Sequence, residues 1–198
     1  MNTAAAQFAP DTARRETHAL FLHAVMEFLA ARRLTDPVKK RVPEHTRRTL
    51  ERPPLADRWI PAHAVEDVFE ALHDLGGAPL NLQLGKFAAR RMTEGRLRPL
   101  IAGIFSLRGK SPESIFKSLD VCFSLAMRGV SFTYQGSRRA AFVVASFTGG
   151  GIHEGAHHAV RGSLLHAFEL TGAHGEVDAP ELLADDGQAV RIRYSVRF

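Results

Sequence analysis

The sequence predicts an α+β protein, an α/β sandwich in which a layer of helices packs on a four-stranded antiparallel sheet. Three observations carry this prediction. Apolar side chains recur at helical spacing through most of the first half of the chain, the period changes to two at Val130, and residues 190–198 alternate apolar with mostly cationic side chains. Residues 1–11 are expected to be a disordered arm and residues 12–198 to form one domain.

Composition narrows the class of protein. The 198 residues are 45% hydrophobic and 24% charged, which is typical of a globular protein. Cys122 is the only cysteine, which excludes an intrachain disulfide and a zinc site built from several cysteines. No segment approaches the roughly 20 apolar residues that a membrane span needs. We therefore expect a cytoplasmic protein without a membrane span.

The first half of the chain is predicted to be helical. A first helix runs from about Phe21 to Leu34 on its apolar spacing. Residues 35–61 hold five of the ten prolines and are predicted to form a basic, irregular connection with at most short helical turns. Further helices are predicted over about 61–75 and 84–92, on either side of Gly76 and Gly77, and a shorter helix after Pro99.

The second half combines helices with the sheet. Ser111, Pro112 and Glu113 form a strong helix start, and we expect that helix to continue to Arg128. Residues 130–134 and 140–147 are predicted to pair as a β-hairpin. A helix then follows over 152–171, weakened by its glycines. The last strand alternates clearly, and its partner is expected near 176–183.

The order of these elements resembles a known family. The segments that carry the resemblance are RWIP, LQLGKFAARR, SPESIFKSL, RGSLLHAFELTGAHG and VRIRYSVRF. They resemble a bacterial family of uncharacterised proteins of about this length, which is similar at a distance to haem-nitric-oxide-binding-like sensor domains, four-vinyl-reductase domains and TRAPP-type trafficking subunits. The resemblance covers about residues 64–198. It implies a dimer-forming helical face and either an apolar or porphyrin ligand, haem included, or a role in assembling protein complexes.

A ligand pocket is predicted beside the helix 111–128. This helix leads directly into the hairpin, so its apolar side must pack on the sheet, and any space between the two layers would suit an apolar ligand. The residues expected around that space are Phe116, Leu119, Cys122, Phe123, Phe132, Phe142 and Val144. For Cys122, a role as a small core residue is the alternative. The leading interpretation is a non-enzymatic ligand-sensing or adaptor domain in bacterial signalling or regulation.

A homodimer is expected on two grounds. The resemblance implies a dimer-forming face, and about six amphipathic helices are predicted, whereas one face of a sheet accommodates two or three. The surplus helices need either a partner or a helical layer of their own.

A zinc-dependent hydrolase is the first alternative function. Residues 153–157 read HEGAH, the HExxH pattern in which His153 and His157 would bind zinc and Glu154 would act on water. Against this interpretation, Ser163 stands where a third ligand is expected six residues later, although His166 or a nearby glutamate could replace it. Zinc is a cofactor only under this alternative.

A protein interaction module without a small-molecule ligand is the second alternative. From Arg32 to Arg58 the chain has nine Lys or Arg residues against four Asp or Glu residues, and the last strand has a cationic face. Such surfaces could dock an acidic protein partner. The basic segment contains several prolines and no helix-turn-helix pattern, so we expect no sequence-specific binding of nucleic acid.

Overall fold

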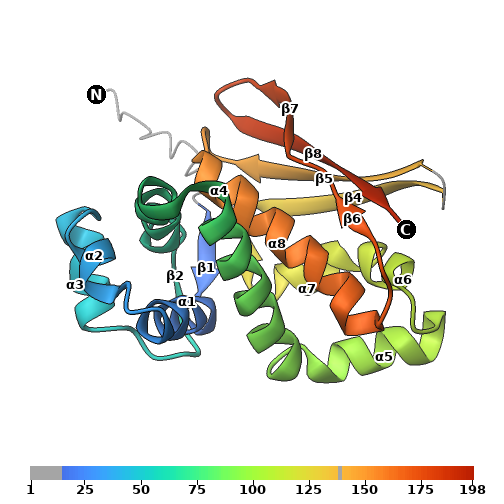
Figure 1. The fold of residues 1–198 in the computed structure, drawn as a ribbon, viewed down its shortest axis with the longest axis horizontal. Helices are drawn as coiled ribbons and strands as arrows, with labels where there is room; N and C mark the ends of the chain where they lie inside the picture. The colour runs from blue at the N-terminus through green and yellow to red at the C-terminus, as the bar shows by residue number, and fades with distance from the viewer. Residues whose placement is uncertain (1–14, 138–139) are drawn as a thin grey trace, which may run out of the picture.

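The computed structural model describes residues 15–137 and 140–198, so the predicted arm 1–11 lies outside the described residues. Figure 1 shows a sheet at the top of the molecule and a mass of helices below it. The elements, in chain order, are β1 (Glu16–His18), α1 (Ala19–Ala31), α2 (Thr35–Lys39), α3 (Glu44–Glu51), β2 (Trp59–Pro61), α4 (His63–Glu94), α5 (Arg98–Arg108), α6 (Pro112–Phe116), α7 (Leu119–Ser124), β3 (Met127–Arg128), β4 (Val130–Ser137), β5 (Ala140–Thr148), α8 (Glu154–Thr171), β6 (Glu176–Val177), β7 (Glu181–Asp185) and β8 (Ala189–Arg197).

The strands form two antiparallel sheets. The larger sheet has five strands in the order β4-β5-β8-β6, with β7 also paired to β8, and the smaller has three in the order β2-β1-β3. The α+β class is confirmed, but the predicted count of four strands is wrong. The segment expected to supply one partner strand supplies two, β6 and β7. The strands of the small sheet are two or three residues long, too short to show a period of two.

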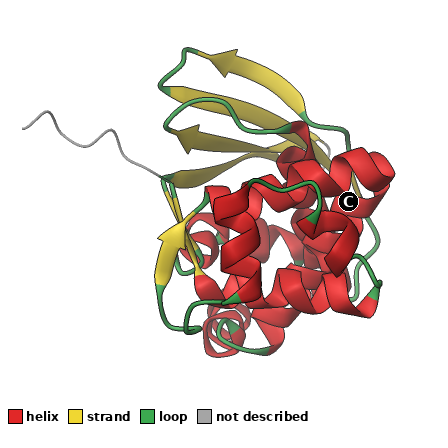
Figure 2. Ribbon diagram, turned by 90° about the vertical axis from the view of Figure 1, so that its left-hand side faces the viewer, coloured by secondary structure: helices red, strands yellow, loops and turns green. Residues whose placement is uncertain are grey.

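The predicted hairpin and last strand are confirmed. Strand β4 pairs with β5 from Val130 opposite Phe147 onward, and β5 pairs with β8 from Ala141 opposite Val196 to Thr148 opposite Ala189. Side chains of β5 and β8 that point to one face are buried, among them Val143, Ala145 and Ile192 at 0% exposure. Figure 2 shows why: the helices pack against one face of the larger sheet, and no helix covers its other face.

Residues 35–61 are more regular than predicted. The five-residue helix α2 is within the expectation of short turns, but α3 is a helix of eight residues and Trp59–Pro61 forms strand β2. The prolines are compatible with this structure because of their positions. Pro37 lies in the first turn of α2 and Pro43 at the N-cap of α3, where a missing N–H breaks no helical hydrogen bond.

Helix α4 contains both helices that were predicted over 61–75 and 84–92. It is interrupted at Gly77, whose backbone (φ 64°, ψ −160°) is not helical. Glycine adopts this positive φ without the steric cost that a Cβ brings. The predicted break at the glycine pair is therefore confirmed as a kink inside one long element.

The segment 111–128 is not one continuous helix. Ser111 caps α6 as predicted, its side chain accepting from the N–H of Ser114, but the helix ends at Phe116. Ser118 departs from helical geometry (φ −114°, ψ 5°) and its hydroxyl donates to the carbonyl of Ser114 at 2.9 Å. A second short helix, α7, then leads through β3 into the hairpin. The hydroxyl competes for a backbone carbonyl, which favours a break at this position.

Two hydrophobic clusters form the interior. One lies between the larger sheet, helices α5 to α8 and the end of α4, and the other lies among α1 to α4 and the first half of α8. Phe21 and Ile152 pack against both clusters, so the two are continuous. The helices that exceed what the sheet can cover thus have a helical layer of their own. Among the described residues, none of the helices combines the length and apolar composition that crossing a bilayer requires.

Helices α4 and α8 make the most extensive contact in the protein, and glycines bring their backbones together. A Cβ on Gly85 of α4 would lie 1.8 Å from the carbonyl oxygen of Ala159 on α8. A Cβ on Gly162 of α8 would lie 2.1 Å from the carbonyl oxygen of Leu82 on α4. The glycines that lower the helix propensity of residues 152–171 are therefore the residues that let α8 pack on α4.

We predict that Gly85→Ala lowers the free energy of unfolding by about 2 kcal/mol or more, because two backbones must separate to admit the methyl group. Gly103→Ala is the matched control, since a Cβ at this helical position meets no heavy atom within 4 Å. It should raise stability by roughly 0.5–1 kcal/mol through helix propensity. Urea unfolding measures both variants. Equal stabilities for the two would contradict the role assigned to the glycine contact.

Candidate functional site

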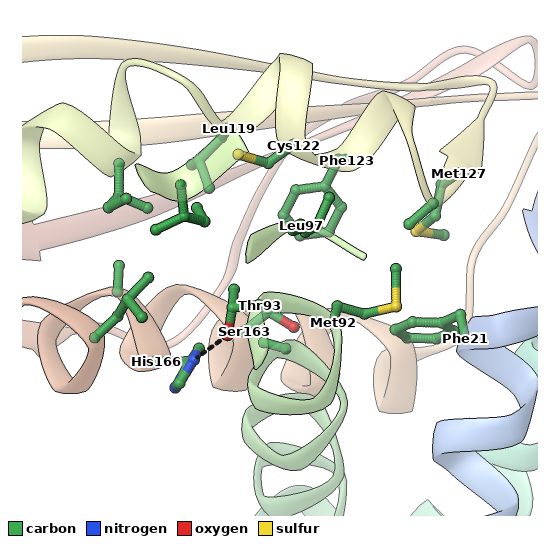
Figure 3. A pocket seen from close by; sticks show the side chains of 16 residues that line it. Phe21, Met92, Thr93, Leu97, Leu119, Cys122, Phe123, Met127, Ser163 and His166 are labelled. Carbon is green, nitrogen blue, oxygen red and sulfur yellow. Dashed lines mark hydrogen bonds between the residues drawn. The ribbon is translucent and has the colours of Figure 1, made fainter. Parts of the chain in front are cut away.

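A cavity of about 70 Å³ lies between α7 and the facing parts of α4 and α8. In Figure 3, Leu119, Cys122 and Phe123 of α7 form one wall, and Thr93, Ser163 and His166 stand on the opposite wall. The full lining comprises Phe21, Ala89, Met92, Thr93, Leu97, Ile101, Ile115, Leu119, Cys122, Phe123, Ala126, Met127, Ser163, His166, Ala167 and Leu170. This volume is several times the roughly 10–15 Å³ that one water molecule requires.

The lining is almost entirely apolar and carries no net charge. Its polar side chains are Thr93, Ser163, His166 and the thiol of Cys122. Burial raises the pKa of the Cys122 thiol to about 11. The thiol is therefore protonated at neutral pH and contributes a weakly polar, unreactive surface.

Three of the seven residues predicted around the pocket line the cavity: Leu119, Cys122 and Phe123. Phe132 lies behind them, its ring packed on that of Phe123 at 4.1 Å between centroids. Phe116 is buried away from the cavity, edge-on to Phe168 and stacked on Tyr134. Because the helix breaks at Ser118, Phe116 belongs to a different helix from the three residues that line the cavity.

Phe142 and Val144 do not reach the cavity, and their placement there is a correction to the prediction. Both are half-buried on β5, where the alternate residues Val143 and Ala145 point toward the helices. Phe142 instead lies under the guanidinium of Arg193, 5.9 Å from the ring centroid, on the face that no helix covers. Successive side chains of a strand point to opposite faces of the sheet. The prediction assigned the even-numbered residues of β5 to the helix side, whereas the odd-numbered residues face the helices, so both Phe142 and Val144 lie on the other face.

Several lining residues were missed because they come from distant parts of the chain. Phe21 projects from α1, Met92 from α4 and Ile101 from α5, whereas His166 belongs to α8. In the sequence, the three apolar residues indicated only helical apolar stripes, and His166 indicated only an ordinary histidine or a replacement for the third zinc ligand. No local pattern in the sequence indicates that these four helices meet, so only the packing reveals the site.

A chain of hydrogen bonds ends at the cavity wall. His166 Nδ1 lies 3.2 Å from a carboxylate oxygen of Glu169, and His166 Nε2 lies 2.9 Å from the hydroxyl of Thr93. Burial lowers the pKa of His166, which outweighs the opposite effect of Glu169. Burial would raise the pKa of Glu169, but hydrogen bonds from Lys86, His166 and Arg90 prevail and lower it to about 2. At neutral pH the carboxylate is ionised and the imidazole is neutral.

The HExxH pattern has a different geometry from a zinc peptidase helix. His153 is the N-cap of α8, half-exposed, and its Nε2 lies 3.2 Å from Glu70. His157 lies within the helix and is largely buried, and its Nε2 has no hydrogen-bond partner. The two histidines therefore differ in exposure and in hydrogen bonding: His153 pairs with Glu70, whereas the Nε2 of His157 has no partner. Within residues 15–137 and 140–198, no three His, Cys, Asp or Glu side chains are grouped so that they could hold a metal ion.

The cationic face of β8 is paired with the acidic stretch that precedes it. Arg193 contacts Glu181 at 2.5 Å, and Arg197 contacts Glu176 at 2.7 Å and Asp178 at 2.6 Å. The two basic side chains therefore have carboxylate partners within the same sheet. This pairing reduces the positive charge that the strand presents to an acidic partner.

The sequence itself has no match among family models or curated proteins. Solved structures do match over almost the whole chain. An oxygen-binding H-NOX domain related to soluble guanylate cyclases has a TM-score of 0.61 at 12% identity, covering 91% of this chain and 94% of its own. A point mutant of T. tengcongensis H-NOX reaches 0.66 at 12% identity, with 91% and 97% covered. Fe(II) unliganded H-NOX from K. algicida reaches 0.65 at 11% identity, with the same coverage.

The chain therefore has the fold of H-NOX domains, as the distant resemblance to haem-nitric-oxide-binding-like proteins implied. Two further structures that match, at TM-scores of 0.65 and 0.61, were determined to study haem distortion and haem redox potential. Haem is thus a cofactor of proteins with this fold, and its fit to the present residues can be tested on the lining of the cavity.

The residues around the cavity do not fit haem. Both ring nitrogens of His166 have hydrogen-bond partners, and the Cys122 thiol is protonated, so neither is a ready axial ligand. The described lining holds no Lys or Arg to pair with the two propionates. The volume of about 70 Å³ is also far below the roughly 300–1,000 Å³ of pockets that hold larger ligands.

We predict that stability falls as the pH drops from about 6.5 to 4, in part through His157. Burial and the neighbouring His158 lower the pKa of His157 from 6.5 to about 4 in the folded protein. Within this window the unfolded chain binds a proton that the native protein does not, so protonation favours unfolding. His157→Gln should reduce the loss of stability between pH 7 and pH 5, measured by urea unfolding. His174→Gln, at an exposed position, is the control, and identical pH profiles for both variants and the wild type would contradict the prediction.

Proposed function

We propose that the protein is a non-enzymatic sensor or adaptor domain that binds a small apolar ligand in the cavity beside Cys122. The observation that carries the proposal is the apolar lining, to which α1, α4, α5, α6, α7, α8 and β3 all contribute. A ligand there contacts elements from most of the chain, so its binding energy can shift how they pack. The H-NOX fold supports the proposal, since a neighbour of that fold is described as oxygen-binding.

The chemistry of the wall supports binding rather than catalysis. Thr93, His166 and Glu169 have the order of a nucleophile, a base and an orienting carboxylate. Acyl transfer also needs free N–H donors that stabilise an oxyanion. Thr93 and Ser163 lie inside α4 and α8, where backbone N–H groups are used by the helices. The described wall therefore lacks the donors that would make Thr93 an effective nucleophile.

The proposal extends to the cellular location, the oligomeric state and the partners of the protein. The domain, residues 12–198, acts in the cytoplasm of a bacterium, in signalling or regulation, as a homodimer. Exposed apolar side chains such as Leu107 at 87% and Val121 at 54% offer surface for a second copy. An acidic protein partner remains the alternative for the basic segment 32–58, whose surplus of Lys and Arg lies mainly outside α2 and α3. A zinc hydrolase has less support, because His153 and Glu70 pair outside the helical face that the motif requires.

The proposal predicts that benzene, a small apolar probe, binds to the cavity. Met92 and Met127 line it, whereas Met26 packs on the other core cluster. In protein labelled with ¹³C at the methionine methyls, benzene should shift the Met92 and Met127 signals in a saturable manner and leave Met26 unchanged. A titration to millimolar benzene without such shifts would refute the proposed ligand site.

Filling the cavity should abolish binding without unfolding the protein. Cys122→Leu adds volume that the cavity can receive, so we expect a change in stability below about 1 kcal/mol and no benzene-induced shifts. Ala145→Leu is the matched control, because Ala145 is fully buried outside the cavity lining. Overpacking there should cost roughly 1–3 kcal/mol. A loss of similar size for Cys122→Leu would assign Cys122 to the close-packed core.

Haem should not bind specifically to this protein. The described cavity wall lacks a free imidazole, a thiolate and cations for the propionates. We therefore expect titration of the purified protein with hemin to give only weak, non-saturating absorbance changes, unaffected by His166→Ala. A saturable Soret band at one haem per chain that is lost in His166→Ala would show instead that the cavity wall ligates haem.

A further inference from the structure

The order of donors and acceptors in the hydrogen-bond chain of the cavity wall determines which polar group a ligand must carry. Glu169 contacts Lys86 at 2.5 Å and Arg90 at 3.1 Å, and both contacts favour its ionised form. An ionised carboxylate only accepts hydrogen bonds. The Nδ1 of His166, 3.2 Å away, therefore carries the proton and donates it to Glu169. The neutral imidazole then presents Nε2 as an acceptor, because only one of its two nitrogens holds a proton.

Thr93 is consequently left as an acceptor toward the cavity. Its hydroxyl has one proton and two acceptors within reach, His166 Nε2 at 2.9 Å and the carbonyl of Arg90 at 3.0 Å. Whichever acceptor receives that proton, the oxygen has a lone pair left and no proton to give to a third partner. Both competing acceptors belong to the protein. The wall at Thr93 therefore offers a ligand an oxygen that accepts a hydrogen bond.

The rest of the lining determines what else the ligand carries. Apart from Thr93 and His166, the polar groups of the described lining are the Cys122 thiol and Ser163. The hydroxyl proton of Ser163 is directed to the carbonyls of Gly85 and Ala159, each at 3.2 Å, so Ser163, like Thr93, has no proton to donate to a ligand. The described lining includes no charged side chain, so an ionised head group would be buried without a partner at high cost. A neutral ligand is therefore favoured over an acid or an amine.

We propose that the natural ligand is a small neutral molecule with an apolar body and one hydroxyl group, an alcohol or a phenol, whose hydroxyl donates a hydrogen bond to Thr93. Ligand, Thr93, His166 and Glu169 then form one continuous series of donors and acceptors that ends on the carboxylate. Thr93 and His166 are binding residues in this assignment, and Glu169 is a positioning residue that fixes the imidazole. The proposal rests on the proposed function, because it names the ligand of the same cavity.

Three aromatic probes of similar size distinguish the chemistry: benzene, anisole and phenol. Benzene has no polar group, anisole has an ether oxygen that only accepts, and phenol has a hydroxyl that can donate. Titrations are followed through the methyl signals of Met92 and Met127, with Met26 as the internal reference for folding. Phenol should bind more tightly than benzene because it donates a hydrogen bond to Thr93. The ether oxygen of anisole cannot donate and should add no affinity.

Thr93→Val removes the hydroxyl and keeps the shape of the side chain, and Thr93→Ser is the conservative control. We expect Thr93→Val to weaken phenol binding by roughly three- to tenfold, the usual worth of one hydrogen bond. Benzene binding should change by less than about twofold, which also shows that the variant retains the cavity. Thr93→Ser should bind phenol as the wild type does.

The outcomes separate the two proposals. If benzene and phenol bind but Thr93→Val weakens both or neither, the hydroxyl assignment is overturned while the apolar ligand site stands. If anisole binds as tightly as phenol and depends equally on Thr93, the donor requirement is wrong. If no probe shifts Met92 or Met127, both the site and its ligand class are overturned. Selective weakening of phenol in Thr93→Val supports the assignment.

Discussion

Backbone contact between α4 and α8 sets the distance between the N-terminal helices and the larger sheet. The two helices carry the cores on either side of them, and three glycines let them approach more closely than any residue with a Cβ would allow. Gly155 adds to the pair already described, since a Cβ there would lie 2.4 Å from the carbonyl oxygen of Phe69. Glycine costs helix propensity at each position. The tighter packing over the length of α8 offsets that cost.

The cavity is a consequence of this close approach. Ser163, next to Gly162 in the contact, donates to the carbonyl of Gly85 and also lines the cavity. Farther along α4, Thr93 still contacts His166 of α8 at 2.9 Å, and α7 lies on the other side of the cavity from both helices. A change in how α4 lies on α8 therefore alters the cavity, and a ligand in the cavity acts on the same contact. Under the proposed function, this shared contact is how a bound ligand would change the packing of α4 on α8.

The sequence was informative where a pattern is local. Alternation in residues 190–198, the glycine break in α4 and the cap at Ser111 each identified an element correctly. It was not informative where both faces of a strand are apolar. In residues 140–147, the odd-numbered and the even-numbered side chains are both largely apolar. The neighbouring strand decides, because Val143 pairs with Tyr194 and Ala145 with Ile192, whose faces are unambiguous. Phe142 and Val144 were therefore assigned to the wrong face, whereas Leu119, Cys122 and Phe123 line the cavity. Thr93 and His166 could not be paired in advance, because 73 residues separate them and only the helix contact brings them together.

The proposed function requires above all that the space beside Cys122 is an accessible, apolar binding cavity. A crystal of the protein pressurised with xenon tests this directly, since xenon enters apolar cavities and scatters strongly. We expect anomalous density for xenon bounded by Met92, Leu119 and Cys122, and displacement of no ordered water. A cavity closed by repacked side chains, or filled by a hydrogen-bonded network of waters without xenon, would contradict the account.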